Sequence, residues 1–209
     1  MDSITRFCMA QREIGLSMGE PPASKGYTPS VFSLLPKLVE RAGTSGSGGS
    51  ITGIYTVLVE GDDLDDPIAD AARSYLDGHI ILSRKLVHRN HFPAVDVLES
   101  TSRVMPAVTS PEHIALARQI REWMAVYAQA EDLINIGAYA PGSNPKIDQA
   151  IAVIDRINAF LRQPVEETAD IGQTLALMLG TVRAGEAFMA ARQAGPVKQA
   201  QQTGPRQRF

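Results

Sequence analysis

The sequence has little that would place the protein outside the cell or within a membrane. Its 209 residues include one cysteine, Cys8, which excludes an internal disulfide and is typical of a reducing compartment. No apolar run approaches the roughly 18 residues that span a bilayer, and no signal-peptide pattern opens the chain. These absences predict a cytoplasmic protein with at most peripheral membrane association.

The sequence also lacks a large excess of charge of either sign. Its formal net charge is −3 and 21% of its residues are charged, which gives no electrostatic reason to expect a nucleic-acid partner. Hydrophobic residues make up 44% of the chain, enough for a core of ordinary size. The length predicts one or two globular domains.

A glycine-rich loop for nucleotide phosphates is absent as well. Such a loop needs Gly-Lys-Ser/Thr, because backbone N–H groups and one ammonium hold the phosphates. None of the five lysines follows a glycine; they are Lys25, Lys37, Lys85, Lys146 and Lys198. The four histidines have no zinc-ligand spacing with Cys8, and the acidic run 62–66 lacks the glycine and terminal glutamate of a calcium loop.

The first 50 residues show signals for two helices and two loops. Apolar and polar residues after Asp2 suit a helix that ends near residues 15–19, before a loop rich in helix breakers. Pro29 favours a second helix start, and Pro36 within that pattern predicts a kink. Residues 43–50 are rich in Gly and Ser, so we expect an exposed, flexible loop there.

Strand signals follow, separated by helical ones. The nearly continuous β-prone run 51–60 is typical of a strand covered on both faces in a parallel sheet. Acidic residues before Pro67 indicate a helix start. Residues 79–82 and 94–97 resemble further strands on either side of a helix over 84–89. The alternation predicts an α/β fold.

From Ser110 onward the signals are helical. Ser110-Pro111-Glu112 and Asn144-Pro145 are typical helix starts, and apolar residues at helical spacing mark three successive amphipathic helices. We therefore predict a first domain over 1–109, a helical domain over 110–194 and, because apolar residues become scarce, a disordered tail over 195–209.

Several stretches carry a family resemblance in their order and number. They include Asp2-Ser3-Ile4-Thr5-Arg6-Phe7, Gly19-Glu20-Pro21-Pro22, Gly26-Tyr27-Thr28-Pro29-Ser30-Val31-Phe32, Tyr55-Thr56-Val57-Leu58-Val59-Glu60-Gly61-Asp62-Asp63, Asp77-Gly78-His79-Ile80, His91-Phe92-Pro93-Ala94-Val95-Asp96-Val97-Leu98, Ser102-Arg103-Val104-Met105 and 131–139. Together they cover most of residues 1 to 165. The chain resembles the C-terminal portion of the ATPases of flagellar and type III secretion export, which are related to the rotary ATP synthase catalytic subunit.

The resemblance implies an incomplete RecA-like P-loop core followed by a C-terminal helical domain, with ATP and Mg²⁺ as cofactors. It also implies a hexameric ring at the inner face of the membrane, in contact with export apparatus proteins, a stator or regulator, and export substrates or chaperones. In the family, the N-terminal barrel, the phosphate loop and the catalytic carboxylate would precede Met1. We therefore expect this polypeptide alone to hydrolyse ATP negligibly.

The resemblance assigns two residues to the phosphate side of the nucleotide pocket. Asp2 matches the strand-end carboxylate that binds Mg²⁺ through water, and Arg6 would help to order the phosphates. Read without the family, Asp2 would be a capping residue and Arg6 a surface residue.

Arg103 matches the arginine that reaches the γ-phosphate held by a neighbouring subunit. A planar, permanently charged guanidinium suits the charge of the transferring phosphoryl group, and such arginine fingers contribute on the order of 10³ to 10⁵ in rate. The alternative for Arg103 is an ordinary ion pair with Glu99 or Glu112.

Four further residues match positions around the bound nucleotide. Phe92 corresponds to the aromatic that stacks on adenine, where the family more often has Tyr, and only the ring face is needed. Phe160 and Val165 match the helical-domain side of that pocket, and Tyr55 lies near the phosphates. The alternative for all four is a place in the hydrophobic core.

Two functions follow from different classes. The first is the C-terminal portion of an export ATPase, from a split gene, a late start codon or an incomplete sequence. The second is a non-enzymatic interaction module that binds export substrates, chaperones or the full-length ATPase. An upstream frame encoding Gly-Lys-Thr would favour the first.

Overall fold

The computed structural model describes residues 1–194, which form two compact units. Unit 1 contains residues 1–83 and 99–104, and unit 2 contains residues 84–98 and the described residues from 105 onward. The division into domains at 109/110 stays a prediction. The predicted tail, 195–209, lies outside the described residues.

Three helices of unit 1 begin where the sequence predicts. In α1 (Ile4–Ser17), the Ser3 side chain accepts a hydrogen bond from the Arg6 N–H and so caps the first turn. α2 (Pro29–Val39) starts at its proline and continues as one helix past Pro36. α3 (Pro67–Tyr75) is capped by Asp66, which accepts hydrogen bonds from two main-chain N–H groups. The loop between α1 and α2 contains the short 3₁₀ turn η1 (Ser24–Gly26).

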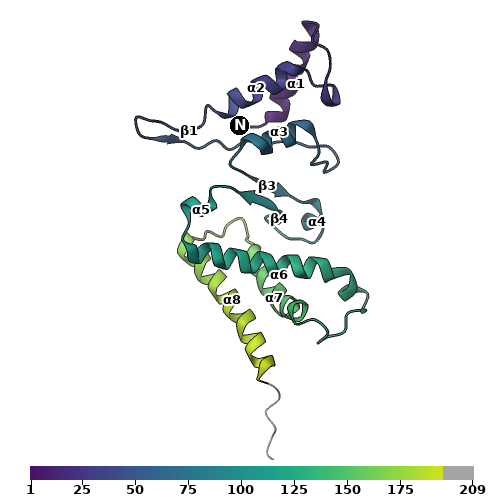
Figure 1. The fold of residues 1–209 in the computed structure, drawn as a ribbon, viewed down its shortest axis with the longest axis vertical. Coiled ribbons are helices and arrows are strands. Elements are labelled where there is room, and N and C mark those ends of the chain that lie inside the picture. The colour runs from purple at the N-terminus through teal and green to yellow at the C-terminus, as the bar shows by residue number, and fades with distance from the viewer. Residues whose placement is uncertain (195–209) are drawn as a thin grey trace, which may run out of the picture. The chain divides into compact units, whose positions relative to one another are not determined.

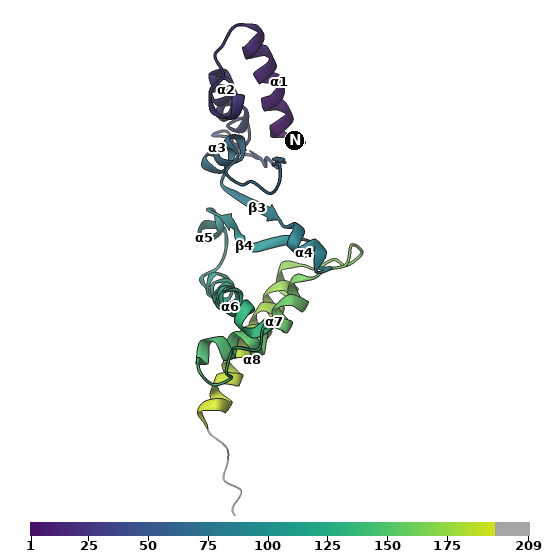
Figure 2. The same ribbon diagram turned by 90° about the vertical axis from the view of Figure 1, so that its right-hand side faces the viewer.

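These three helices share one hydrophobic core. α1 packs on α2 (Figure 2), and α3 adds Ile68 to a cluster that includes Ile4, Cys8 and Leu35. Burial, with a smaller effect of the Asp66 carboxylate, raises the pKa of the Cys8 thiol to about 11. Since the thiolate is the reactive form, Cys8 is a core residue and an unreactive thiol.

The predicted strand over 51–60 is largely wrong. Only β2 (Ser50–Ile51) is a strand, and it pairs antiparallel with β1 (Gly43–Thr44), so the glycine-rich loop forms an exposed hairpin (Figure 1). Residues 52–59 are extended, and from Ile54 to Glu60 their side chains alternate between exposed and half-buried. The helices of unit 1 cover only one face of this segment. Its apolar residues on the other face therefore stay exposed, although the sequence is apolar enough for a strand buried on both faces.

The extended segment pairs instead with the first residues of the chain. The Met1 ammonium donates to the Ile54 carbonyl at 2.7 Å, and the Ile4 N–H donates to the Thr56 carbonyl at 2.9 Å. The Thr5 hydroxyl then bonds both the N–H and the carbonyl of Leu58, at 2.8 and 3.1 Å. Residue numbers rise together on both sides, so the two segments run in parallel.

A second pair of strands follows the order predicted from the sequence. β3 (Gly78–Leu82) and β4 (Val95–Ser102) form a two-stranded sheet, and α4 (Arg84–His88) lies between them in the chain. The Arg103 N–H donates to the Asp77 carbonyl and the His79 ring contacts the Glu99 carbonyl, so the strands run in opposite directions. The large parallel sheet expected from the sequence is therefore absent from residues 1–194, whose sheets have two strands each.

Unit 2 is dominated by the three helices predicted from Ser110 onward. After the short α5 (Met105–Val108) come α6 (Pro111–Asn135), α7 (Pro145–Leu161) and α8 (Ile171–Gln193), which pack together as Figures 1 and 2 show. Ser110 and Asn144 cap α6 and α7 as expected. Trp123 lies in this core and is 3% exposed. Its ring lies so close to Gly185 that a side chain at residue 185 would not fit.

A buried carboxylate joins the loop after α6 to the last turns of α8. Asp148 on α7 is 8% exposed and accepts hydrogen bonds from the Tyr139 hydroxyl, the Gly142 N–H and the Arg192 guanidinium. Burial alone would raise the pKa of Asp148, but these three donors outweigh it and hold the pKa below its usual value. The network fixes both the loop and the α8 end against α7.

We expect Asp148→Ala to destabilise unit 2 by about 2 kcal/mol, because the variant leaves three donors without their acceptor. Urea unfolding followed by the fluorescence of Trp123, the sole tryptophan, measures this change. Asp155→Ala is the matched control, since Asp155 is an exposed carboxylate on the same helix. The pKa of Asp148 is lower in the folded chain than in the unfolded chain. The stabilisation by Asp148 is therefore present above the unfolded pKa of about 4 and is lost as pH falls through the folded pKa. An equal loss in the two variants at pH 7 would contradict this role.

Candidate functional site

Asp2 is held at the end of the parallel pairing between residues 1–5 and 54–58. Its side chain is exposed, and its Oδ1 accepts a hydrogen bond from the Thr56 hydroxyl at 2.5 Å. The helix cap is the neighbouring Ser3, so the capping alternative for Asp2 is wrong. A solvent-facing carboxylate with one oxygen fixed can bind a hydrated divalent cation through water.

Arg6 and Tyr55 belong to the same unit but differ in exposure. Arg6 lies in the first turn of α1 with an exposed side chain, which leaves it accessible to an anion. Tyr55 is half-buried against the unit 1 core, and its ring lies so close to Gly53 that a Cβ there would meet the ring at 2.6 Å. Tyr55 thus makes core contacts whatever further role it has.

Arg103 is docked on the C-terminal end of α3. Its Nη2 donates to the Arg73 carbonyl at 3.1 Å and its Nη1 to the Ser74 carbonyl at 3.4 Å. The last carbonyls of a helix carry partial negative charge, so they attract a guanidinium. The side chain remains exposed, and the sequence gives no sign of this docking because α3 lies about 30 residues upstream.

Phe92 and the segment after α7 lie side by side in unit 2. The Gln163 N–H donates to the Phe92 carbonyl at 2.9 Å. The Phe92 side chain is 49% exposed and Val165 is 97% exposed, so the core alternative is wrong for both. Phe160 is half-buried and packs against the helical core. The Phe92 ring and the Val165 side chain are therefore exposed to solvent, whereas Phe160 contributes to the helical core.

His91 precedes this exposed ring and is itself 5% exposed. Burial, and secondarily the positive charge of Arg162, lower the pKa of His91 below its ordinary value. The main-chain N–H of His91 donates to the Leu86 carbonyl at 3.0 Å, which closes the turn after α4. His91 is therefore a buried residue of the turn, which the spacing of the histidines in the sequence did not reveal.

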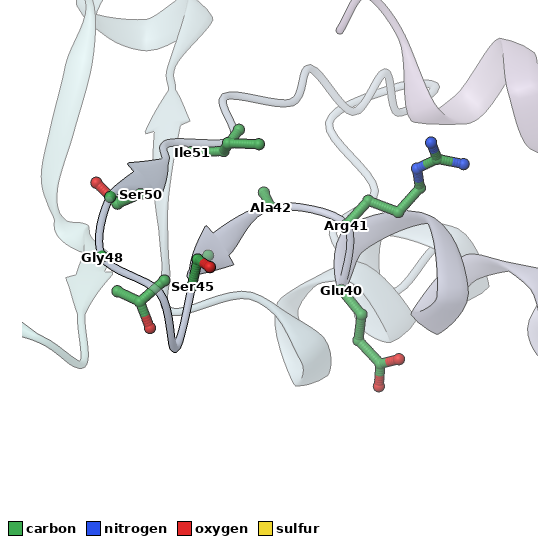
Figure 3. Close-up of a pocket in the computed structure, with 10 residues that line it drawn as sticks. Glu40, Arg41, Ala42, Ser45, Gly48, Ser50 and Ile51 are labelled. Carbon is green, nitrogen blue, oxygen red and sulfur yellow. The ribbon is translucent and has the colours of Figure 1, made fainter.

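A hollow of about 320 Å³ lies in the β1–β2 hairpin and contains none of the predicted site residues. Half of the residues that line it are glycines and serines, and Figure 3 shows its two charged residues, Glu40 and Arg41, pointing away from each other. Polar groups do not converge in it, so it has no evident chemistry. Within residues 1–194 no group of three His, Cys, Asp or Glu is placed to hold a metal, and no helix is long and apolar enough to cross a bilayer.

Two family models match consecutive parts of the chain. Residues 1–102 match the nucleotide-binding domain of the ATP synthase alpha/beta family, and residues 109–179 match the EscN ATPase C-terminal domain of type III secretion systems. The chain belongs to the flagellar and type III secretion ATPase family. The resemblance to export ATPases is thereby confirmed for both the nucleotide-binding part and the helical part of the chain.

Curated relatives agree with this assignment. The flagellum-specific ATP synthase of Pseudomonas aeruginosa is 52% identical over 188 residues, which are 90% of this chain and 42% of the relative. The type 3 secretion system ATPase of Sinorhizobium fredii is 54% identical over 178 residues, 85% of this chain and 39% of that protein. The chain thus spans about two fifths of the length of these export ATPases.

Solved structures confirm the fold class. The assembled ATPase EscN from the enteropathogenic E. coli type III secretion system matches with a TM-score of 0.83 and 46% identity, covering 87% of this chain and 44% of EscN. The ATP synthase subunit NeqB from Nanoarcheaum equitans matches with a TM-score of 0.78 at 23% identity, over 88% of this chain and 46% of NeqB. The chain is an incomplete RecA-like α/β core followed by a helical segment.

We expect unit 2 to lose stability on acidification partly through His91. The pKa of His91 is lower in the folded chain than in the unfolded chain, so the unfolded chain binds the proton more tightly. The contribution of neutral His91 to stability is therefore present above pH 6.5 and is lost as pH falls through the folded pKa. His91→Gln should therefore lose less stability than the unaltered chain between pH 7.5 and pH 5.5 in urea unfolding followed by Trp123 fluorescence.

His88→Gln is the control for that comparison, because His88 is an exposed histidine in the adjacent helix. It should retain the pH dependence of the unaltered chain. If His91→Gln and the unaltered chain weaken equally, His91 does not contribute as described.

Proposed function

We propose that this chain supplies the C-terminal portion of an ATPase that energises protein export through a flagellar or type III secretion apparatus. The observation that carries the proposal is the match of two family models, one to a nucleotide-binding domain and one to the EscN C-terminal domain, in consecutive order along the chain. Export substrates or chaperones, apparatus proteins and a stator or regulator are the proposed partners, at the cytoplasmic face of the membrane.

Asp2 and Arg6 are the proposed phosphate-side residues. When bound, Mg²⁺ would neutralise phosphate charge, and Asp2 would hold it through water. The fixed Oδ1 and exposed carboxylate of Asp2 fit an outer-sphere ligand. Tyr55 would lie nearby as a packing residue, in keeping with its contacts to the core and to Gly53.

Phe92, Phe160 and Val165 are the proposed adenine-binding residues. The Gln163–Phe92 hydrogen bond supports this assignment, because it brings residues about 70 positions apart into one place. An exposed ring can stack on a planar base, and an exposed aliphatic side chain can cover the base edge. Phe160 would support the site from within the helical core.

Arg103 is the proposed arginine finger, acting on nucleotide held by a neighbouring copy. Such action in trans requires a homo-oligomer, for which we propose the hexameric ring of the family. The two carbonyl contacts at the end of α3, at 3.1 and 3.4 Å, would position the guanidinium, and the exposed side chain can reach an anion on a neighbouring copy.

We expect the purified 209-residue chain to show no ATP turnover above buffer, because it has no Gly-Lys-Ser/Thr sequence to orient the phosphates. A coupled phosphate-release assay measures this. Turnover that disappears in Asp2→Ala would overturn the expectation, since it would show a complete catalytic site within these residues.

For the finger, the part of the Pseudomonas aeruginosa relative that precedes its match is fused ahead of residue 1. Arg103→Ala should reduce turnover of this fusion by on the order of 10³, while nucleotide binding stays within about twofold. Arg103→Lys separates the two roles: its ammonium can still bond the α3 carbonyls, but it lacks the planar guanidinium. Full turnover in Arg103→Lys, or equal loss of binding and turnover in Arg103→Ala, would assign Arg103 a structural role instead.

A further inference from the structure

Gln163 makes two hydrogen bonds in the loop that follows α7. Its main-chain N–H donates to the Phe92 carbonyl at 2.9 Å, which ties this loop to the segment between α4 and β4. Its side-chain amide donates to the Glu167 carbonyl, also at 2.9 Å. One glutamine therefore joins two distant segments of unit 2 and also spans the loop that it begins.

The loop spanned by the Gln163 side chain carries Val165. Inside it, the Glu167 N–H donates to the Pro164 carbonyl at 3.1 Å, so the chain turns between these two residues. Val165 lies in this turn and is 97% exposed, so burial of its side chain does not hold it in place. The conformation of residues 163–167 depends on these hydrogen bonds instead.

The Gln163 side chain is not needed to end α7. The Arg162 N–H already donates to the Asn158 carbonyl at 3.1 Å and completes the last turn of that helix. Gln163 is itself exposed and is not a core residue. The bond from its amide to Glu167 therefore acts on the loop that follows the helix.

We propose that Gln163 is a positioning residue for nucleotide binding, which fixes the loop carrying Val165 relative to Phe92. A loop ordered before binding loses less conformational entropy when a ligand is bound, so the amide would raise nucleotide affinity without touching the nucleotide. The inference rests on the proposed function, since it takes Phe92 and Val165 as adenine-binding residues. It adds a residue to which the family resemblance assigned no role.

The test uses the fusion with the preceding part of the Pseudomonas aeruginosa relative. Gln163→Met keeps an unbranched side chain but removes the donor to Glu167. We expect the dissociation constant of a fluorescent ATP analogue and the KM for ATP to rise about fivefold, as for the loss of one hydrogen bond, with kcat within about twofold. Gln163→Lys, which regains a donor of similar reach, should restore most of the affinity.

Tripolyphosphate separates positioning of the base from a general effect on the site. It has no base, so as a competitive inhibitor it should bind Gln163→Met and the unaltered fusion equally well. Gln149→Met is the matched control, because the Gln149 amide also donates to a main-chain carbonyl, that of Gly185, at 2.9 Å. This bond lies between α7 and α8, so its loss should leave the affinity for ATP unchanged.

Four results would overturn the inference while the proposed function stands. They are an unchanged ATP affinity in Gln163→Met, an equal loss of ATP and tripolyphosphate binding, an equal loss in Gln149→Met, and a failure of Gln163→Lys to restore affinity. If the unaltered fusion does not bind ATP, the proposed function fails and the inference fails with it.

Discussion

Unit 1 depends on the parallel pairing of residues 1–5 with residues 54–58. The pairing joins two segments some 53 residues apart, and it brings Ile4 into the same core as α2 and α3. It also fixes the orientation of Asp2, whose Oδ1 receives the Thr56 hydroxyl. Without it, α1 would lose its link to the segment 54–58, and Asp2, the carboxylate proposed for the Mg²⁺ site, would lose the Thr56 contact that holds it.

Hydrogen bonds to main-chain groups also hold Arg103 and Phe92, two other residues proposed for the site. Arg103 satisfies the carbonyls that α3 leaves open at its C-terminal end, so a residue proposed for catalysis also stabilises the fold. Phe92 has an exposed side chain, its carbonyl accepts a hydrogen bond from the Gln163 N–H, and the adjacent His91 is buried. Local hydrogen bonds, and not burial of the functional side chains, hold these residues in place.

The sequence predicted the helices well, because caps and prolines act locally. Ser110-Pro111, Asn144-Pro145 and the acidic residues before Pro67 each begin a helix at the expected residue. The prediction of a strand over 51–60 was wrong because the burial of an apolar run depends on which distant segments pack against it. The family motifs singled out Asp2 and Phe92, whose roles stay predictions, and their contacts with Thr56 and Gln163 could not be predicted, since they join distant segments without a spacing signal.

Amide hydrogen exchange of the free chain tests the central claim, that one edge of residues 54–59 is paired and the other is open. The account predicts slow exchange at Ile4, Thr56 and Leu58, whose N–H groups have acceptors, and fast exchange at Tyr55 and Val57. Equal protection along the segment, or fast exchange at Thr56 and Leu58, would contradict it.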